Sequence, residues 1–326
     1  MTTATCSTIR HAGVRGAFDL TQSASRGFGQ REAAPDAAGM RLGFLLDGSF
    51  RAAGVAVRQP RPDELELTVS GTTQCDVAAA QALRVLSADV DARGWDALGS
   101  ADPVLGRLQA ARPGLRPPLF HSAYEALLWC VLSARRPHAQ GVALRERLNR
   151  AHGTVLEIDG MEVPVSPAPE QMLAVASLPS VPEWKLRRMH GVARAAADGR
   201  LDTAELRALD PAEASARLRE LPGIGPYYAE LVVVRALGHT DVLPLGEPAV
   251  LAVAGALLTG NGPLSVAQLQ QRTAAWSPWR TWGVCGDARR GPPAARPGRG
   301  AVTRRLRAPR GPGRGDRSRR RHRITP

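Results

Sequence analysis

The spacing of apolar residues changes along the chain and divides it into a strand-rich part and a helix-rich part. Between Thr8 and Ser70, short runs in which apolar and polar residues alternate, such as Leu65 to Val69, are separated by Gly, Pro and Asp turns, which predicts strands. From Asp76 to Ser87 the apolar residues recur at helical spacing. We therefore expect a small α/β domain over residues 1–115, ending near a proline-rich segment.

Beyond that segment the apolar residues recur at the spacing expected of helices. Gly, Pro and Asp breakers separate the predicted helices, which are 124–132, 142–148, 168–176, 185–197 and 203–209. We find no internal repeat and expect an all-helical domain over residues 116–285, so the predicted fold class is α+β.

Composition excludes several classes of protein. The 326 residues suit two domains, and 44% hydrophobic with 22% charged residues is typical of a soluble globular chain rather than a disordered or collagen-like one. The four cysteines lie far apart without a C-x-x-C pair, which argues against zinc, an iron–sulfur cluster or a disulfide framework. The sequence lacks an apolar segment long enough to predict a signal peptide or a membrane span. We therefore expect a cytoplasmic protein that does not contact membranes.

The positive charge is concentrated at one end. The net charge is +13, and residues 286–326 supply +12 of it through 14 Arg and 2 acids. The same segment has 7 Gly, 6 Pro and no aromatic residue, which predicts a disordered tail. Such a tail either attracts phosphate without sequence preference or is a solvated extension without function.

The most informative segment runs from Asp210 to Val250. Asp210 and Pro211 predict a helix start, with Glu213 able to complete a capping box. The turn Leu221-Pro222-Gly223-Ile224-Gly225 then leads into a second helix, which Pro226 starts and Gly238 stops. Two glycines permit positive φ and a close backbone approach, and the start of the second helix offers N–H groups to a phosphate. The alternative is an ordinary turn between two helices.

The string L-P-G-I-G-P-x-x-A-E within this segment resembles the helix-hairpin-helix motif of DNA repair glycosylases. Asp241-Val242, followed by an acidic residue at a helix start, resembles the 3-methyladenine DNA glycosylase II family. Two further segments are similar to that family: residues 102–117 followed by Tyr124-Glu125, and the W-S-P-W-R-T-W run from Trp276 to Trp282. The resemblance covers residues 1 to about 285.

The resemblance implies a monomeric, monofunctional enzyme that excises alkylated purines from double-stranded DNA by flipping the damaged nucleotide into a pocket. It implies a TATA-binding-protein-like α/β domain before the helical domain. It also implies a structural monovalent cation, held by the backbone carbonyls of Arg219, Leu221 and Ile224, and no catalytic cofactor.

Counting along the motif places Glu247 where the family has its catalytic Asp. A carboxylate beside the anomeric carbon can stabilise an oxocarbenium-like sugar and orient a water molecule. Asp241 is the competing acid, although the resemblance implies a structural role for it. Alternatively, an acidic residue beside a proline at a helix start only interacts favourably with the helix dipole.

Bifunctional members of the superfamily place a Schiff-base lysine at the position of Tyr227, so we expect no lysine-dependent strand cleavage here. The Tyr227 ring could stack on a positively charged alkylated base. Leu231 lies one helical turn further on the same face, and that pair equally suits a core stripe.

Two other features of the resemblance depart from the family pattern. The wedge that opens the duplex is expected in the turn from Ser133 to His138, where Arg135 or Arg136 would insert into the minor groove or contact phosphate, unless both are merely solvated. The resemblance stops at about Val284, through a reading-frame error or divergence. We expect Trp276, Trp279 and Trp282 to be partly uncovered there, with reduced stability.

Two alternatives remain open. The chain could be a catalytically weak relative that only recognises damaged or abasic DNA through the hairpin and the arginine tail. It could also be a helical protein that uses the hairpin for protein contacts.

Overall fold

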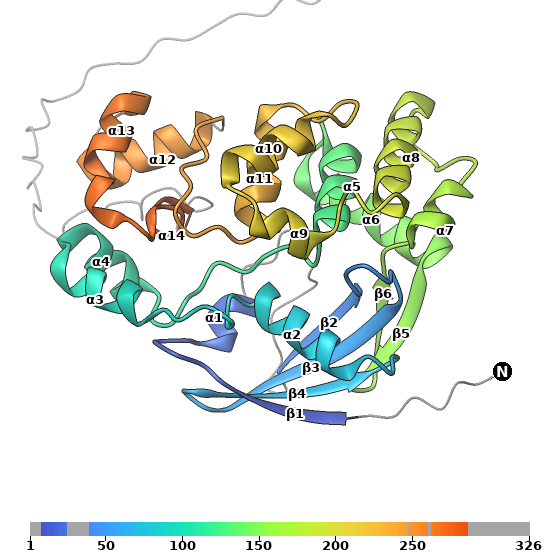
Figure 1. Cartoon of the computed structure of the whole chain (residues 1–326), viewed down its shortest axis with the longest axis horizontal. Helices are drawn as coiled ribbons and strands as arrows, with labels where there is room; N and C mark the ends of the chain where they lie inside the picture. Colours follow the sequence, from blue (N-terminus) through green and yellow to red (C-terminus); the bar gives the residue numbers. More distant parts are fainter. Residues whose placement is uncertain (1–7, 25–38, 247, 260–261, 286–326) are drawn as a thin grey trace, which may run out of the picture. The chain divides into compact units, whose positions relative to one another are not determined.

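The computed structural model describes residues 8–24, 39–246, 248–259 and 262–285 (Figure 1). Glu247 and the predicted tail at 286–326 therefore lie outside the described residues. None of the described helices is both long enough and apolar enough to cross a membrane.

An antiparallel sheet with the strand order β1-β4-β3-β2 forms the N-terminal part, as the alternating pattern predicted. Its strands are β1 (Thr8–Gly13), β2 (Met40–Leu45), β3 (Ala52–Arg61) and β4 (Glu64–Ser70). On β4 the alternating residues Leu65, Leu67 and Val69 are fully buried, and they pack with α2 (Cys75–Val85) in one apolar cluster. A short helix, α1 (Leu20–Ala24), contributes to the same cluster.

The helical part contains the predicted helices. They are α5 (Ala123–Ser133), α6 (His138–His152), α7 (Pro169–Leu173), α8 (Glu183–Ala197), α9 (Thr203–Ala208), α10 (Pro211–Arg219) and α11 (Pro226–Arg235). Further along the chain are α12 (Pro248–Thr259), α13 (Val266–Arg272), the 3-10 turn η1 (Ala274–Trp276) and α14 (Arg280–Cys285). The central helix α5 is buried on almost every side, which matches its continuous apolar sequence.

The expectation of an all-helical domain over 116–285 is wrong, because a β-hairpin interrupts the helices. Its strands are β5 (Thr154–Ile158) and β6 (Met161–Val165). Asp159 and Gly160 both adopt positive φ between them, as a two-residue Asp-Gly turn requires. The hairpin lies against β2 and β3, where Gly43 and Gly54 leave room for Val163 and Ile158. It therefore adds two strands beside the N-terminal sheet.

A second correction concerns the three tryptophans near the end of the described chain. Trp276, Trp279 and Trp282 are only 1%, 8% and 4% exposed, so the expectation that they would be partly uncovered is wrong. Two helices that the sequence did not suggest, α3 (Arg93–Ala101) and α4 (Pro103–Ala111), share an apolar cluster with them. The Trp276 indole also donates to Asp102 at 2.8 Å.

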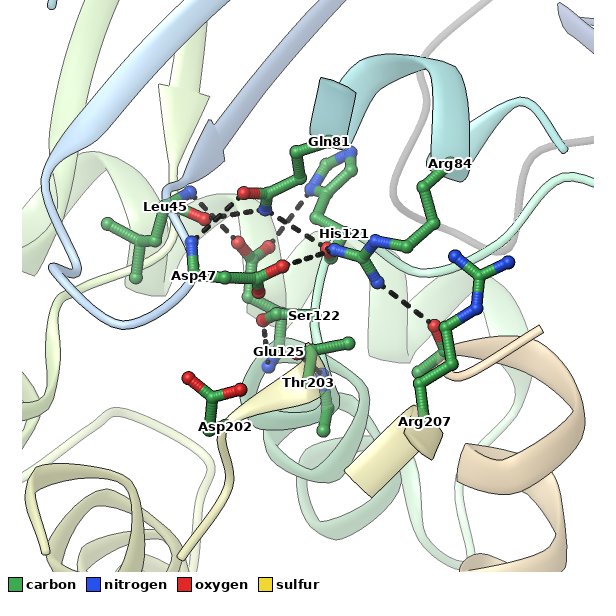
Figure 2. A network of polar contacts seen from close by, with 12 residues as sticks. Leu45, Asp47, Gln81, Arg84, His121, Ser122, Glu125, Asp202, Thr203 and Arg207 are labelled. Atoms are coloured by element: carbon green, nitrogen blue, oxygen red, sulfur yellow. Dashed lines mark hydrogen bonds and ion pairs between the residues drawn. The ribbon is translucent and has the colours of Figure 1, made fainter. Parts of the chain in front are cut away.

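A buried polar network joins the sheet part to the start of α5 (Figure 2). The Arg84 guanidinium on α2 pairs with Asp47 at 2.5 Å and donates to the carbonyls of His121 and Ala236. Within α5, the Glu125 carboxylate accepts from the Leu45 N–H at 3.1 Å and lies 3.1 Å from the His121 ring. Burial works to raise the pKa of Glu125, but His121 and these hydrogen bonds outweigh it and hold that pKa below its usual value.

Candidate nucleic-acid interface and active site

The predicted helix, turn and helix are formed by α10, the turn 220–225 and α11 (Figure 1). Asp210 caps α10 by accepting the Ala212 N–H at 2.8 Å, while Glu213 pairs with Arg217 instead of completing a capping box. Leu221 and Ile224 anchor the turn, because both side chains are buried in the helical core. Between them, Gly223 has φ +86°, a conformation that a side chain disfavours.

The start of α11 lies open at the mouth of this hairpin. Gly225 is the N-cap and Pro226 the first helical residue, so no side chain caps the helix. A Cβ atom built on Gly225 would meet no atom within 4 Å. Backbone N–H groups and the positive end of the helix dipole at such a start favour an anion.

The two predicted pocket residues differ in exposure. The Tyr227 side chain is 40% exposed, and its ring lies 5.3 Å from the Tyr228 ring. Leu231 is half-buried and packs against the helical core cluster. Leu231 thus fits the core stripe, whereas Tyr227 presents its ring at the surface beside the hairpin. Their role in a base pocket stays a prediction.

The segment that leads to the predicted catalytic position is held by the hairpin. Gly246, the residue before Glu247 in the sequence, donates its N–H to the Glu230 carboxylate of α11 at 2.8 Å. Sequence reasoning assigned no role to Glu230, although it is the final residue of the hairpin motif string. It connects the second hairpin helix to the loop that precedes α12.

The competing acid, Asp241, is engaged by the W-S-P-W-R segment. Its carboxylate accepts from Arg280 Nε at 2.7 Å and Nη2 at 2.9 Å, and from Ser277 Oγ at 2.8 Å. Burial works to raise the pKa of Asp241, but the bonds from Arg280 and Ser277 outweigh it and lower that pKa. This arrangement favours a structural role.

The two arginines of the predicted wedge turn behave differently. Arg136 donates to the Ser180 carbonyl, just before α8. Arg135 is exposed and has φ +55°, the left-handed conformation that is uncommon for a residue with a side chain. Of the two candidates, Arg135 is therefore the one whose side chain is presented to solvent at the tip of the turn.

The side chain of Lys185 on α8 forms hydrogen bonds with the backbone at the start of the wedge turn. Its ammonium donates to the carbonyls of Leu132 at 2.9 Å and Ala134 at 2.7 Å, at the end of α5. The side chain is buried, and burial together with the nearby charge of Arg136 lowers the pKa of Lys185 to about 8. It is the only lysine in the sequence, and nothing in the sequence pattern around it predicts this role.

The carbonyls predicted to hold a monovalent cation belong to the end of α10 and the hairpin turn. Hard cations prefer oxygen ligands, and the Leu221 carbonyl, which accepts the Ile224 N–H at 3.0 Å, keeps a second lone pair. The donor set of Arg219, Leu221 and Ile224 thus suits such an ion. Over the described ranges, no cluster of His, Cys, Asp and Glu side chains is arranged for a metal.

A cavity of about 380 Å³ lies elsewhere in the described chain. Trp95 and Leu108 of α3 and α4, Trp282 of α14, Arg235 and the proline-rich segment 112–118 contribute to its mostly apolar walls. None of the described residues among the predicted site residues lines it, so this cavity is separate from the hairpin turn.

Proteins of similar sequence are found among DNA repair enzymes. The chain matches no family model. It is 27% identical over 250 residues to a probable bifunctional transcriptional activator/DNA repair enzyme AlkA of Mycobacterium tuberculosis, covering 73% of this chain and 49% of that protein. It is 24% identical over 199 residues to a DNA-3-methyladenine glycosylase of Bacillus subtilis, covering 60% of this chain and 65% of that protein. The chain thus spans about half the length of the mycobacterial relative.

Among solved structures, a 3-methyladenine DNA-glycosylase from Archaeoglobus fulgidus superposes with a TM-score of 0.72 at 16% identity. The match covers 86% of this chain and 98% of that protein, so it includes the sheet as well as the helices. The chain is thus similar in sequence to DNA-3-methyladenine glycosylases and shares the fold of one whose structure is solved.

Proposed function

We propose that this protein is a monofunctional DNA N-glycosylase that excises alkylated purines of the 3-methyladenine type in base-excision repair. The observation that carries the proposal is the bond from Gly246 to Glu230, because it ties the segment leading to Glu247 to the helix whose start lies open for a phosphate. The names of the relatives support the same activity.

Double-stranded DNA with an alkylated base would be the partner. The Gly223–Gly225 turn and the uncapped start of α11 would bind one phosphate. A monovalent cation on the carbonyls of Arg219, Leu221 and Ile224 would add positive charge at the same turn. This recognition requires no sequence-specific base contact.

Base flipping would use the wedge turn. Arg135, exposed at its tip, would occupy the space that the flipped nucleotide leaves. The ring of Tyr227 would stack on the extruded base, since alkylation gives many such bases a positive charge that an aromatic face attracts.

Glu247 would supply the carboxylate for hydrolysis. As the bond from C1′ to the base nitrogen breaks, the sugar becomes oxocarbenium-like and the negative charge stabilises it. The carboxylate also orients a water molecule, whose oxygen bonds to C1′ while its proton is released. The base leaves with the electron pair of the broken bond.

Lyase activity is not expected. Tyr227 stands where a bifunctional enzyme would have its amine, and the Lys185 ammonium is buried with bonds to two carbonyls. Borohydride should therefore trap no covalent complex with DNA that contains an abasic site.

We further infer a monomer in the cytoplasm, with an N-terminal sheet part of the TATA-binding-protein-like kind. The arginine-rich segment 286–326 would add unspecific attraction to DNA.

The test measures release of 3-methyladenine and 7-methylguanine from alkylated duplex DNA. Glu247→Gln should lose at least about a hundredfold in rate, while Glu247→Asp, which keeps the charge on a shorter side chain, should retain activity. Asp241→Asn is compared at a temperature where it remains folded and should retain more activity than Glu247→Gln.

Equal base release by wild type and Glu247→Gln would remove Glu247 from its role. Tight binding to an abasic-site analogue with no release of any damaged base would instead select the alternative of a DNA-binding relative without turnover.

A further inference from the structure

One aromatic side chain on α8 is unusually exposed. The chain has six tryptophans, all within the described residues, and five of them are at most 8% exposed. Trp184, in the first turn of α8, is 44% exposed. A large aromatic ring at the surface is available to stack on or pack against a partner.

Arg188 lies one turn after Trp184 and stacks on it, with its guanidinium carbon 4.9 Å from the centre of the ring. The same side chain reaches the hairpin: a Cβ atom built on Gly223 would lie only 2.8 Å from Arg188 Nε. The Trp184–Arg188 stack therefore borders the turn that is proposed to bind phosphate.

Within the part of the chain that the structure describes, no carboxylate pairs with Arg188, whereas the adjacent Arg187 pairs with Glu183. A cation that is stacked on an aromatic ring but lacks a counter-charge can bind an anion without first breaking an ion pair.

The helix that carries the stack also contacts the wedge turn, because the Lys185 ammonium, next to Trp184 in the sequence, donates to the Ala134 carbonyl at 2.7 Å. Burial raises the pKa of the Tyr228 phenol, and the charges of both Arg135 and Arg188 oppose that rise. Both guanidinium groups are thus within electrostatic reach of one hydroxyl group. A DNA strand that runs from the hairpin to Arg135 would pass Arg188.

We propose that Arg188 and Trp184 form a second strand contact beside the hairpin. Arg188 binds the phosphate next to the one seated at the start of α11, and the exposed face of Trp184 packs on the deoxyribose between them. The proposal rests on the proposed binding of DNA by the hairpin.

The first test measures binding to a duplex that contains an abasic-site analogue, at several salt concentrations. Arg188→Gln should weaken binding about fivefold and reduce the slope of log K against log salt by about 0.9, the value of one phosphate contact. Arg188→Lys should keep most of that slope. Arg187→Gln, the matched control on the same helix, should leave the slope unchanged.

The second test measures the wild-type protein and uses one variant only to assign the signal. Acrylamide should quench the fluorescence of exposed Trp184 in the free protein, and bound DNA should shield it. Trp184→Phe should lack this quenchable component.

Equal slopes for Arg188→Gln and Arg187→Gln, or unchanged quenching in the complex, would overturn the second contact while leaving the hairpin proposal intact. A wild-type protein that binds no DNA at low salt would instead refute the proposed function itself.

Discussion

The buried network around Arg84 and the exposed surface around the hairpin both contain arginine, but they use it in opposite ways. In the network, the Arg84 guanidinium meets a carboxylate and two carbonyls, and it joins α2 to the segments beside α5 and after α11 (Figure 2). At the surface, Arg135 and Arg188 are exposed and form no ion pair with any described residue. The difference separates charges that hold the fold from charges available to an anionic partner.

The largest effect should follow from breaking the network. Arg84→Met leaves Asp47 partly buried without its partner, and removal of one member of a buried pair costs about 3–5 kcal/mol of unfolding free energy. Urea denaturation at pH 7 measures it. Burial raises the pKa of Asp47, so a neutral Asp47 is tolerated better and the loss should shrink as pH falls towards 4.

Arg207→Ala is the matched control for this variant. Arg207 pairs with Asp89 at the surface, and such a pair contributes at most about 1 kcal/mol. Equal losses for the two variants would show that the buried network is no stronger than a surface pair.

Substitutions at the two hairpin glycines should separate an effect on protein stability from an effect on DNA binding. Gly223→Ala forces a side chain into φ +86° and against Arg188, so we expect a loss of about 1–2 kcal/mol in thermal or urea unfolding. Gly225→Ala meets open space, so only the poorer capping by alanine should matter, and we expect a loss of at most about 1 kcal/mol. It should nevertheless weaken DNA binding about tenfold, because a methyl group would stand where the phosphate approaches.

Full DNA affinity in Gly225→Ala would contradict the proposed phosphate position. A stable Gly223→Ala would show that the positive φ is not needed at that residue.

Substitutions of the two wedge-turn arginines should differ less in stability than those of the two hairpin glycines. Arg135→Gly relieves the left-handed conformation and should leave stability unchanged or raise it by up to about 1 kcal/mol, while base release falls. Arg136→Ala removes the bond to Ser180 and should cost about 1 kcal/mol. Fluorescence of 2-aminopurine beside the lesion, which reports unstacking, should decrease for Arg135→Gly relative to wild type. The assignment of Arg135 as the wedge fails if that signal is unchanged.

A further effect, confined to alkaline pH, concerns a single proton on Lys185. Its pKa is about 8 in the folded protein against 10.5 ordinarily, so the unfolded chain binds that proton more tightly between these values. The free energy of unfolding should therefore gain a positive contribution as pH rises from about 8 to 10.5. Lys185→Met should lack this contribution when the two pH profiles are subtracted, and parallel profiles would contradict the burial of a charged amine.

Local signals in the sequence predicted much of the hairpin surface. Pro226 at the start of α11, Gly238 after its end and the glycine turn each act within a few residues, and the structure has the expected helices around them. The β5–β6 hairpin was also encoded locally, by Asp159-Gly160 between two short β-rich runs, but the surrounding helical period obscured it.

Features that depend on distant contacts could not be predicted. Nothing near Trp184 or Arg188 in the sequence shows that α8 borders the hairpin turn. Likewise, the burial of the C-terminal tryptophans requires α3 and α4, which are far away in the chain.

The bond between Asp102 and Trp276 spans 174 residues, and this separation has a consequence for synthesis. At roughly 5–20 residues per second, a ribosome needs about 9–35 s to deliver the indole after the aspartate has been added. During that interval α3 and α4 lack the apolar partners that cover them, while α5, α8 and the hairpin can already assemble. The hairpin turn proposed to bind DNA could thus assemble before α3 and α4 gain the partners that cover their apolar side chains.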